Sequence, residues 1–427
     1  MVNTSVAVFH PGTQHSWQTA RALQGLGRLQ WYATSIYYQP DLWPYRLERL
    51  PGPIGRKLGR EFRRFHVEGL APGNVRTSGL YEWMERLAER RGMPRLSTWL
   101  DKRGNLAFGR ALEQDIAADG DFHLWGYDNS SLTAFQAGQL HGRTCILDRT
   151  IGDLNAYNAE MLALQENYGD WFVHKGEQFD NQRIEQAAAE HELADIILVG
   201  SPFAQRTMET NNPPAIARKV EVLEYSFDAA NYAHVPPPGP VPKDRPVRFL
   251  HLGLVIPRKG IQHTLEAIMQ LPAGEASLTV VGDIKVPPEV FARYRDRITH
   301  IPHVARADVA RIMSEHDVFV FPTYFEGAGI VLYEALACGM AIIQTDRAAS
   351  AVTPDTGIML PRPDTELLVA AMKEVIEDRD RLNYWRSRAQ GEAVKYHFSG
   401  YSQRIESLLR RLDGQKAATP RSSALPA

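Results

Sequence analysis

The sequence predicts an α/β protein with two domains, each built on a parallel β-sheet that is covered by helices. Short apolar runs bounded by turn residues alternate with helix-length amphipathic segments along most of the chain, as in parallel sheets with helices on both faces. A proline-rich stretch divides this alternation near the middle of the chain. The length of 427 residues is that of two or three domains of ordinary size.

The composition excludes several classes of protein. Lys and Arg number 48 against 50 Asp and Glu, and a formal net charge of -2 argues against a protein that mainly coats nucleic acid. No apolar run approaches the roughly 18 residues that a membrane-spanning helix needs. Two cysteines, Cys145 and Cys338, exclude a disulfide framework and a Cys-rich zinc site. We expect no secretory leader and a cytoplasmic location.

The N-terminal domain is expected over residues 1–234. An apolar run at 5–10 predicts a buried strand that Pro11 and Gly12 end, and a helix is expected to follow over 16–26. Further strands are predicted at 122–126, 144–148, 195–199 and 220–223.

A basic segment at 46–64 interrupts this alternation. It has a local net charge of +5, from seven basic residues and two acidic ones, with apolar side chains between them. Such a segment could bind an anionic membrane surface, which would place the protein at the inner face of the membrane, or a phosphorylated acceptor. The alternative is a solvated helix that covers one face of the domain. The basic residues are Arg46, Arg49, Arg56, Lys57, Arg60, Arg63 and Arg64.

Residues 235–246 include six prolines and are predicted to be the linker between the domains, because proline at this density continues neither a ladder nor a helix. The C-terminal domain is expected over 247–394. A final helix over 395–412 has one apolar stripe, and the small and polar residues 413–427 predict a disordered tail. The strands of the C-terminal domain are predicted at 247–253, 277–282, 317–322 and 341–344.

The stretch 317–345 is the one most indicative of chemistry. It predicts a strand, a loop with the sequence Glu-Gly-Ala-Gly-Ile, a helix over about 329–337 and a second strand. Free backbone N–H groups before a helix suit a phosphate or diphosphate, and glycines let a ligand approach the backbone closely. Glu326 could then accept hydrogen bonds from hydroxyls, and Glu334 could reach a ribose. Alternatively, Glu326 only complements the helix dipole.

This stretch resembles the two-glutamate motif of retaining family 4 glycosyltransferases, also called glycosyl transferases group 1, which have the GT-B fold. Other segments of the chain are similar to the same family in the same order, so that the resemblance covers most of 194–380 and is weak over 30–145. These segments are 194–203, 219–228, 249–267, 278–283 and 301–304.

The resemblance implies two Rossmann-like domains that face each other across a cleft. The first would bind the acceptor and the second the nucleotide-sugar, and the final helix would cross back to the first domain. The enzyme would move a sugar from a UDP- or GDP-linked donor to a carbohydrate or lipid-linked acceptor with retention of configuration. Family members commonly build bacterial surface polysaccharide or glycolipid. The nucleotide-sugar is a substrate, so no cofactor is expected.

The resemblance also implies site residues. Lys259 would bind the donor diphosphate and Glu326 the hydroxyls of the donor sugar, and we expect these two to be the catalytic residues. Glu334 would contact the ribose. The other expected donor-binding residues are Gly12, Arg258, His303, Val304, Gly327, Ala328, Gly329 and Ile330.

Two departures from the family pattern affect the site. The family commonly has an arginine where this chain has Leu254, and Arg258 is the candidate substitute. The family histidine of the N-terminal domain is missing from 146–153, where Asp148, Arg149 and Asp153 are the polar residues. The weaker acceptor-binding candidates are His15, His123, Arg149 and Asp153.

No metal site is predicted, because the one Asp-x-Asp spacing, at 378–380, fits a helix end better than a metal site. We expect no nucleic-acid partner. Two alternatives to the main reading stay open. One is a GT-B enzyme with a small soluble acceptor, and the other is a non-catalytic paralogue that scaffolds an assembly complex.

Overall fold

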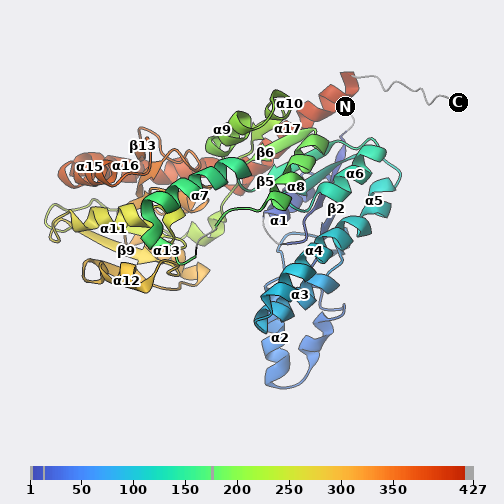
Figure 1. Ribbon diagram of the computed structural model, residues 1–427, viewed down its shortest axis with the longest axis horizontal. Helices are drawn as coiled ribbons and strands as arrows, with labels where there is room; N and C mark the ends of the chain where they lie inside the picture. The colour runs from blue at the N-terminus through green and yellow to red at the C-terminus, as the bar shows by residue number, and fades with distance from the viewer. Residues whose placement is uncertain (1–2, 13–14, 175–176, 419–427) are drawn as a thin grey trace. The chain divides into compact units, whose positions relative to one another are not determined.

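The computed structural model describes residues 3–12, 15–174 and 177–418. It divides into two compact units made of interleaved segments. Unit 1 comprises residues 1–149, 185–198 and 402–427, and unit 2 comprises 150–184 and 199–401. Figure 1 shows the order of the elements along the chain.

The first sheet has seven strands in the order β3-β2-β1-β4-β5-β6-β7, and its described pairings are parallel. The five strands predicted from apolar runs are present, whereas β2 and β3 were not predicted. β2 has the sequence LeuGlnTrpTyrAlaThr, in which polar residues hide the apolar run, and β3 has only three residues. The strands are β1 (Ser5–Phe9), β2 (Leu29–Thr34), β3 (Val75–Thr77), β4 (Phe122–Tyr127), β5 (Cys145–Arg149), β6 (Ile196–Val199) and β7 (Val220–Val222).

The second sheet has six strands in the order β10-β9-β8-β11-β12-β13, and its described pairings are again parallel. The four predicted strands are present, and β10 and β13 lie unpredicted at the two edges. The strands are β8 (Val247–Leu252), β9 (Ala276–Val281), β10 (Ile298–Ile301), β11 (Val318–Phe321), β12 (Ala341–Thr345) and β13 (Gly357–Leu360).

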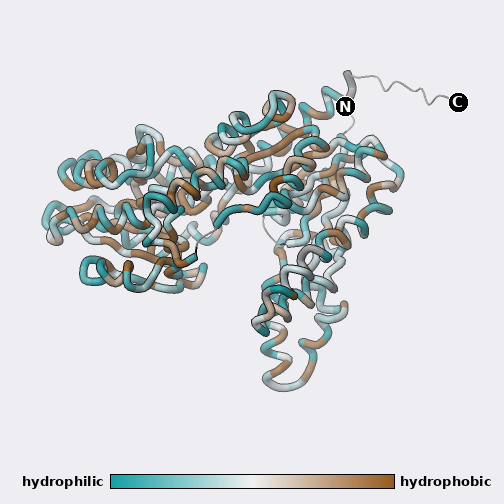
Figure 2. The backbone as a smooth tube through the Cα atoms, viewed as in Figure 1, coloured by the Kyte–Doolittle hydropathy of each residue, from teal (hydrophilic) through white to brown (hydrophobic). Residues whose placement is uncertain are grey.

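Both faces of the second sheet are buried. Phe249 and Val320 belong to the hydrophobic cluster on one face, while Leu250 and Phe321 belong to the cluster on the other. A parallel strand covered on both sides is therefore apolar at most positions, which explains why its sequence is a nearly continuous apolar run. The hydrophobic stretches of the strands are visible in Figure 2.

Helices cover the sheets, and several begin at side chains that the sequence marks as caps. Asp153, Ser201, Asp364 and Asp378 each accept a hydrogen bond from a backbone N–H in the first turn of the helix that follows. The helices up to residue 217 are α1 (Ser16–Gly25), α2 (Pro53–Arg63), α3 (Leu80–Arg90), α4 (Pro94–Ala111), α5 (Glu113–Ala117), α6 (Leu132–Leu140), α7 (Leu154–Tyr168), α8 (Asn181–Leu193), α9 (Pro202–Asn211) and α10 (Pro214–Ala217). The later ones are α11 (Ile261–Met269), α12 (Pro288–Ala292), α13 (Arg306–Ser314), α14 (Val331–Ala337), α15 (Thr365–Glu377), α16 (Arg379–Ala393) and α17 (Phe398–Ala418).

The expected linker at 235–246 contains no helix or strand and packs against other parts of unit 2. Val241 is buried and its N–H donates to Asn383 Oδ1 at 2.7 Å, while Arg386 donates to the carbonyl of Gly239 at 2.6 Å. Arg245 makes a two-pronged ion pair with Asp317, at 2.6 and 2.9 Å. The segment is thus held in place along its length. The two compact units are each made of several segments, and neither unit begins or ends at 235–246. A domain boundary at 235–246 therefore stays a prediction.

The final helix, α17, begins at Phe398 and continues to Ala418. Its predicted apolar stripe is buried, and from Ser402 onward it belongs to unit 1, where Asp413 pairs with Arg28 at 2.8 Å. The expectation of a disordered tail from 413 was wrong for 413–418, because Ala, Gln and Lys favour helix and the Arg28 pair anchors its last turns. Residues 419–427 lie outside the described part of the chain. The stripe consists of Tyr401, Ile405, Leu408, Leu409 and Leu412.

In the described part of the chain, none of the helices combines the length and the apolar character that a bilayer crossing requires.

Candidate active site

The site in unit 2 forms where the segments after β8 and β11 meet, since these two strands are neighbours in the sheet. Gly260 has a left-handed backbone (φ 71°), and a Cβ on it would collide with the carbonyl of Pro322. The carbonyl of Arg258 accepts hydrogen bonds from the Tyr324 N–H at 2.8 Å and from Thr323 Oγ1 at 3.1 Å. Glycine at 260 therefore lets the turn that bears Arg258 lie directly on the loop that bears Glu326.

Two cations converge on one carboxylate in this site. The ammonium of Lys259 donates to Glu326 Oε2, and Arg258 Nη1 lies 3.3 Å from the same oxygen. Arg258 also donates to the carbonyl of Phe325. The Lys259 and Glu326 side chains are only 14% and 18% exposed. The structure thus brings together three of the expected donor-site residues, while the substitution of Arg258 for an arginine at 254 stays a prediction. Leu254 itself is half exposed.

The charges of this site favour an anion. Burial and the neighbouring Arg258 guanidinium lower the pKa of Lys259 well below its usual range, while the Glu326 carboxylate opposes this shift by favouring the ammonium form. Burial also lowers the pKa of Arg258, and Tyr157 and Glu177 act in the opposite direction. Arg258 and Lys259 share one carboxylate oxygen in a largely buried place, and an added anion beside them would favour the charged form of both side chains.

Two histidines that the sequence analysis did not single out lie near this group. His251 is fully buried on β8, and burial together with Lys259 lowers its pKa to about 3. His263 on α11 has its ring nitrogens 2.7 Å from Tyr324 Oη and 2.8 Å from Thr365 Oγ1, and burial lowers its pKa to about 4. Both imidazoles are therefore neutral near pH 7. The sequence feature that could have pointed to His251 is its place in a mostly apolar strand shortly before the Lys259-Gly260 turn.

The glycine-rich loop before α14 is held by packing against two other segments of unit 2. A Cβ on Gly327 would collide with the carbonyl of Thr150, and the Gly327 carbonyl accepts a hydrogen bond from Ser201 Oγ at 2.6 Å. Gly329 has a left-handed backbone (φ 78°). Within the described residues, none of the backbone N–H groups of Gly327, Ala328, Gly329 and Ile330 has a hydrogen-bond acceptor. The loop is therefore fixed in shape and still has donors to offer to a ligand.

Glu334 lies apart from this group, in the first turn of α14. It is buried, Arg306 Nη2 lies 3.5 Å from its Oε1, and Tyr232 also bonds to it. Burial raises the pKa of Glu334, and Arg306 and Tyr232 oppose the rise. The loop that contains exposed His303 and half-buried Val304 leads directly into α13, whose first residue is Arg306.

The acceptor-side candidates have structural partners of their own. His123 is buried on β4, with Nε2 3.7 Å from Asp413 Oδ1 of α17, and Arg149 Nη1 lies 2.8 Å from His191 Nε2. Asp153 caps α7 and also accepts from Asn212 at 3.0 Å. His15 is the N-cap residue of α1, and burial lowers its pKa to about 4.

Gly12, His15, His123 and Arg149 belong to unit 1, whereas Asp153 belongs to unit 2 with the Lys259 group. Donor binding by Gly12 and acceptor binding by the other four residues stay predictions. Among the residues that the structure describes, no group of three or more His, Cys, Asp or Glu is placed to hold a metal ion.

Comparisons with known proteins bear on the same segment. Residues 246–378 match the family model of Glycosyl transferases group 1. The lipopolysaccharide glucosyltransferase WaaG of Escherichia coli strain K12 is 32% identical over 110 residues, which are 24% of this chain and 29% of WaaG. A GDP-mannose-dependent phosphatidylinositol monomannoside mannosyltransferase of Corynebacterium glutamicum is 28% identical over 157 residues, which are 34% of this chain and 40% of that protein. The chain thus spans less than half the length of these two relatives.

Solved structures resemble the whole chain at low sequence identity. HepE from Anabaena, solved in complex with UDP, covers 96% of this chain and 100% of its own length with a TM-score of 0.58 and 14% identity. A sucrose-phosphate synthase from Thermosynechococcus elongatus covers the same shares with a TM-score of 0.59 and 16% identity. These likenesses confirm the expected GT-B fold of the chain, and residues 246–378 are the part of it that matches the family model of Glycosyl transferases group 1.

Proposed function

We propose that this protein is a retaining glycosyltransferase that moves a sugar from a nucleotide-diphosphate-sugar to an acceptor. The observation that supports it best is the meeting of Arg258, Lys259 and Glu326 beside a loop with unpaired backbone N–H groups. In this proposal the cations and the loop bind the diphosphate and Glu326 binds hydroxyls of the sugar. Glu334 and the His303–Val304 loop take the ribose and the base.

The chemistry follows from this charge distribution. The bond between the anomeric carbon and the diphosphate oxygen breaks as the acceptor oxygen attacks from the same face, and the leaving diphosphate accepts the acceptor's proton. Negative charge grows on the diphosphate during this step. Arg258 and Lys259 lie fixed in a largely buried site, so they stabilise that charge with little reorganisation. No residue of this chain needs to form a covalent intermediate.

The donor is proposed to be UDP- or GDP-linked, because HepE was solved with UDP and the Corynebacterium relative is named as GDP-mannose-dependent. The acceptor is proposed to be a carbohydrate or a lipid-linked molecule of bacterial surface polysaccharide or glycolipid synthesis, as the names of WaaG and of the mannosyltransferase suggest. The protein would act in the cytoplasm at the inner face of the membrane. A small soluble acceptor and a non-catalytic scaffold are the competing proposals.

A thermal-shift screen of UDP, GDP, ADP and their sugars tests the proposal. A ligand at 100 times its dissociation constant stabilises the folded state by about 2.7 kcal/mol, so the true nucleotide should stand out clearly from the others. Slow hydrolysis of the stabilising nucleotide-sugar by the purified protein would exclude the scaffold. A protein that no nucleotide stabilises would contradict the proposed donor site.

We further propose that transfer needs no divalent metal. The diphosphate is neutralised in this proposal by Arg258, Lys259 and backbone N–H groups. Activity should therefore survive excess EDTA. Complete loss that only Mn²⁺ or Mg²⁺ restores would mean that a metal ion takes this role.

A further inference from the structure

A second site of unusual chemistry lies in unit 1, on the basic segment that the sequence analysis singled out. The segment folds into a short 3-10 helix, η1 (Tyr45–Arg49), followed by α2 (Pro53–Arg63), and we call residues 43–65 the α2 tip. In Figure 1 these elements lie far from the sheet of unit 1, next to α3. Two grooves of opposite character flank α2.

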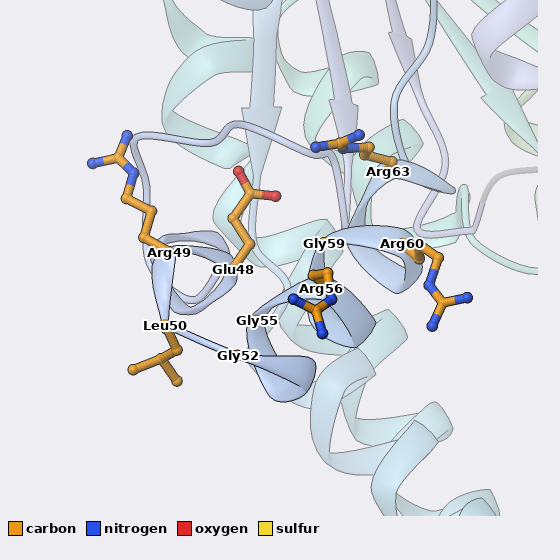
Figure 3. A pocket seen from close by; sticks show the side chains of 9 residues that line it. All are labelled: Glu48, Arg49, Leu50, Gly52, Gly55, Arg56, Gly59, Arg60 and Arg63. Atoms are coloured by element: carbon orange, nitrogen blue, oxygen red, sulfur yellow. The ribbon is translucent and has the colours of Figure 1, made fainter.

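One groove is basic. Arg56, Arg60 and Arg63 follow the i, i+4, i+7 spacing that aligns side chains on one face of a helix, and Arg49 of η1 lies beside them. This groove has a volume of about 710 Å³. Gly55 allows the close approach, because a Cβ there would collide with the carbonyl of Leu50. Figure 3 shows the arginines around the groove, with Glu48 among them.

Two of the four arginines that line this groove are available to a partner. Glu48 is engaged by Tyr38, whose hydroxyl lies 2.8 and 2.9 Å from its two carboxylate oxygens, and Arg49 is paired with Asp41. Within the described part of the chain, neither Arg56 nor Arg60 has an acidic partner, and both are exposed. These two side chains therefore remain free to meet an external anion.

The other groove is apolar and lies between α2 and α3, with a volume of about 450 Å³. Leu58, Phe62, Phe65 and Trp83 form its floor, and Ile54 and Leu87 stand exposed at its edge. Lys57, Glu61 and Arg86 complete the lining, with Arg86 paired to Glu82 at 2.7 Å and Glu61 to Arg64 at 3.8 Å. Ile54 is 64% exposed, and Trp43, which precedes η1, is 74% exposed. Large apolar side chains so exposed beside a basic helix are typical of a surface that meets a membrane interface.

We propose that the α2 tip docks on an anionic lipid bilayer. Trp43 and Ile54 enter the interface, while Arg56, Lys57 and Arg60 contact the lipid phosphates. The long basic side chains border the apolar groove and can reach headgroups while their stems stay in apolar surroundings.

Charge supports a bilayer rather than a neutral protein surface as the occupant. The segment 46–64 has a net charge of +5 within a chain of net charge -2, so the other residues sum to -7 (-2 minus +5). An anionic surface would therefore attract this segment and repel the rest of the molecule, which orients the approach. Vesicle binding requires neither donor nor acceptor, so it tests the surface separately from the proposed transfer.

The test is co-sedimentation of the full-length protein with phosphatidylcholine vesicles that contain or lack phosphatidylglycerol. Wild type should bind only the anionic vesicles, and added salt should weaken the binding. The double variant Arg56→Glu/Arg60→Glu should lower the partition constant by at least about tenfold, since each basic residue near an anionic surface contributes about fivefold. Ile54→Asp should also lower the partition constant. Part of this loss should persist at high salt, because it comes from the lost apolar contact with the bilayer interface.

Matched controls keep the test specific. Arg293→Glu/Lys373→Glu makes the same change of net charge at exposed positions of unit 2, and Leu140→Asp places an aspartate at an 86% exposed leucine of α6. Both should bind vesicles as wild type does. Unchanged melting temperatures would show that every variant is folded.

Three outcomes would overturn the proposal. The first is wild type that does not bind anionic vesicles. The second is equal loss in the α2-tip variants and their controls, which would show a general charge effect. The third is that the α2-tip variants abolish self-association, or the binding of free phosphate, but leave vesicle binding unaffected. Either result would assign another occupant to this surface.

Discussion

Lys259 and Glu326 form an ion pair inside unit 2, although they are 67 positions apart in the chain. The pair holds the ammonium in one place, so it is already positioned when an anion arrives. Because the two side chains share one contact, a ligand that binds one of them also changes the surroundings of the other. A ligand phosphate would share the ammonium with Glu326, and the carboxylate would then be freer to accept hydrogen bonds from hydroxyls.

Replacement of Glu326 tests its proposed contact with the sugar. Glu326→Ala should lower turnover by about a hundredfold, the loss typical of a contact that stabilises the transition state. It should leave the affinity for the nucleoside diphosphate nearly intact, because the proposed contact is to the sugar. Steady-state kinetics and calorimetric titration measure the two effects. Glu315→Ala, at an exposed glutamate of the same unit, is the control, and turnover of Glu326→Ala within about threefold of wild type would exclude this role.

Replacement of Lys259 tests its proposed contact with the diphosphate. Lys259→Ala should weaken the nucleoside diphosphate by about ten- to a hundredfold, the range for a lost hydrogen bond to a charged group. The nucleoside alone should bind nearly as before. The comparison of both ligands, with Lys373→Ala as the control, separates this role from a general disturbance. Equal weakening of both ligands would place Lys259 away from the phosphates.

His251 should make the protein sensitive to acid. Its pKa is lowered to about 3 in the folded state, so the unfolded chain takes up a proton below about pH 6.5 that the folded protein does not. The stability that depends on neutral His251 is complete above pH 6.5 and is lost as the pH falls toward 3. At pH 5 the loss amounts to about 2 kcal/mol.

Denaturant unfolding of His251→Gln between pH 5 and 7 measures this contribution. The variant should lose less stability on acidification than wild type, because it has no imidazole to protonate at this position. His141→Gln, at an exposed histidine, should behave as wild type. Identical pH profiles of all three proteins would contradict the prediction.

Leu409 tests the packing of the final helix. It is fully buried on α17, so Leu409→Ala should lower the free energy of unfolding by about 2–5 kcal/mol through the cavity that it leaves. Ser407→Ala, at an exposed position of the same helix, should have little effect. Truncation after Lys395 removes the whole buried stripe and should make the protein insoluble or inactive. A monomeric, fully active truncated protein would show that α17 is dispensable.

The strands were largely predictable because their signal is local. The apolar runs at 5–10, 247–253 and 317–322 reflect burial on both faces of a parallel sheet, which each run records on its own. The strands that were missed, such as β2 and β13, are polar in places or lie toward the edge of a sheet, so their runs are broken or short. The end of α17 was missed because the propensity of 413–418 was judged without the contact between Asp413 and Arg28.

The site could be predicted only in part. The sequence suggested Lys259, Glu326 and the glycine-rich loop as site residues. It did so through their residue types and through the resemblance of their motifs to a family. The meeting of Arg258, Lys259 and Glu326 depends on the strand order β10-β9-β8-β11, in which β8 lies beside β11 although two strands separate them in the chain. The proximity of His251 to Lys259 and the close approach of Gly327 to Thr150 also join segments that are distant in the sequence. Periodicity and turn chemistry are encoded in a few consecutive residues, whereas these contacts depend on which distant segments pack together, and that only the tertiary structure decides.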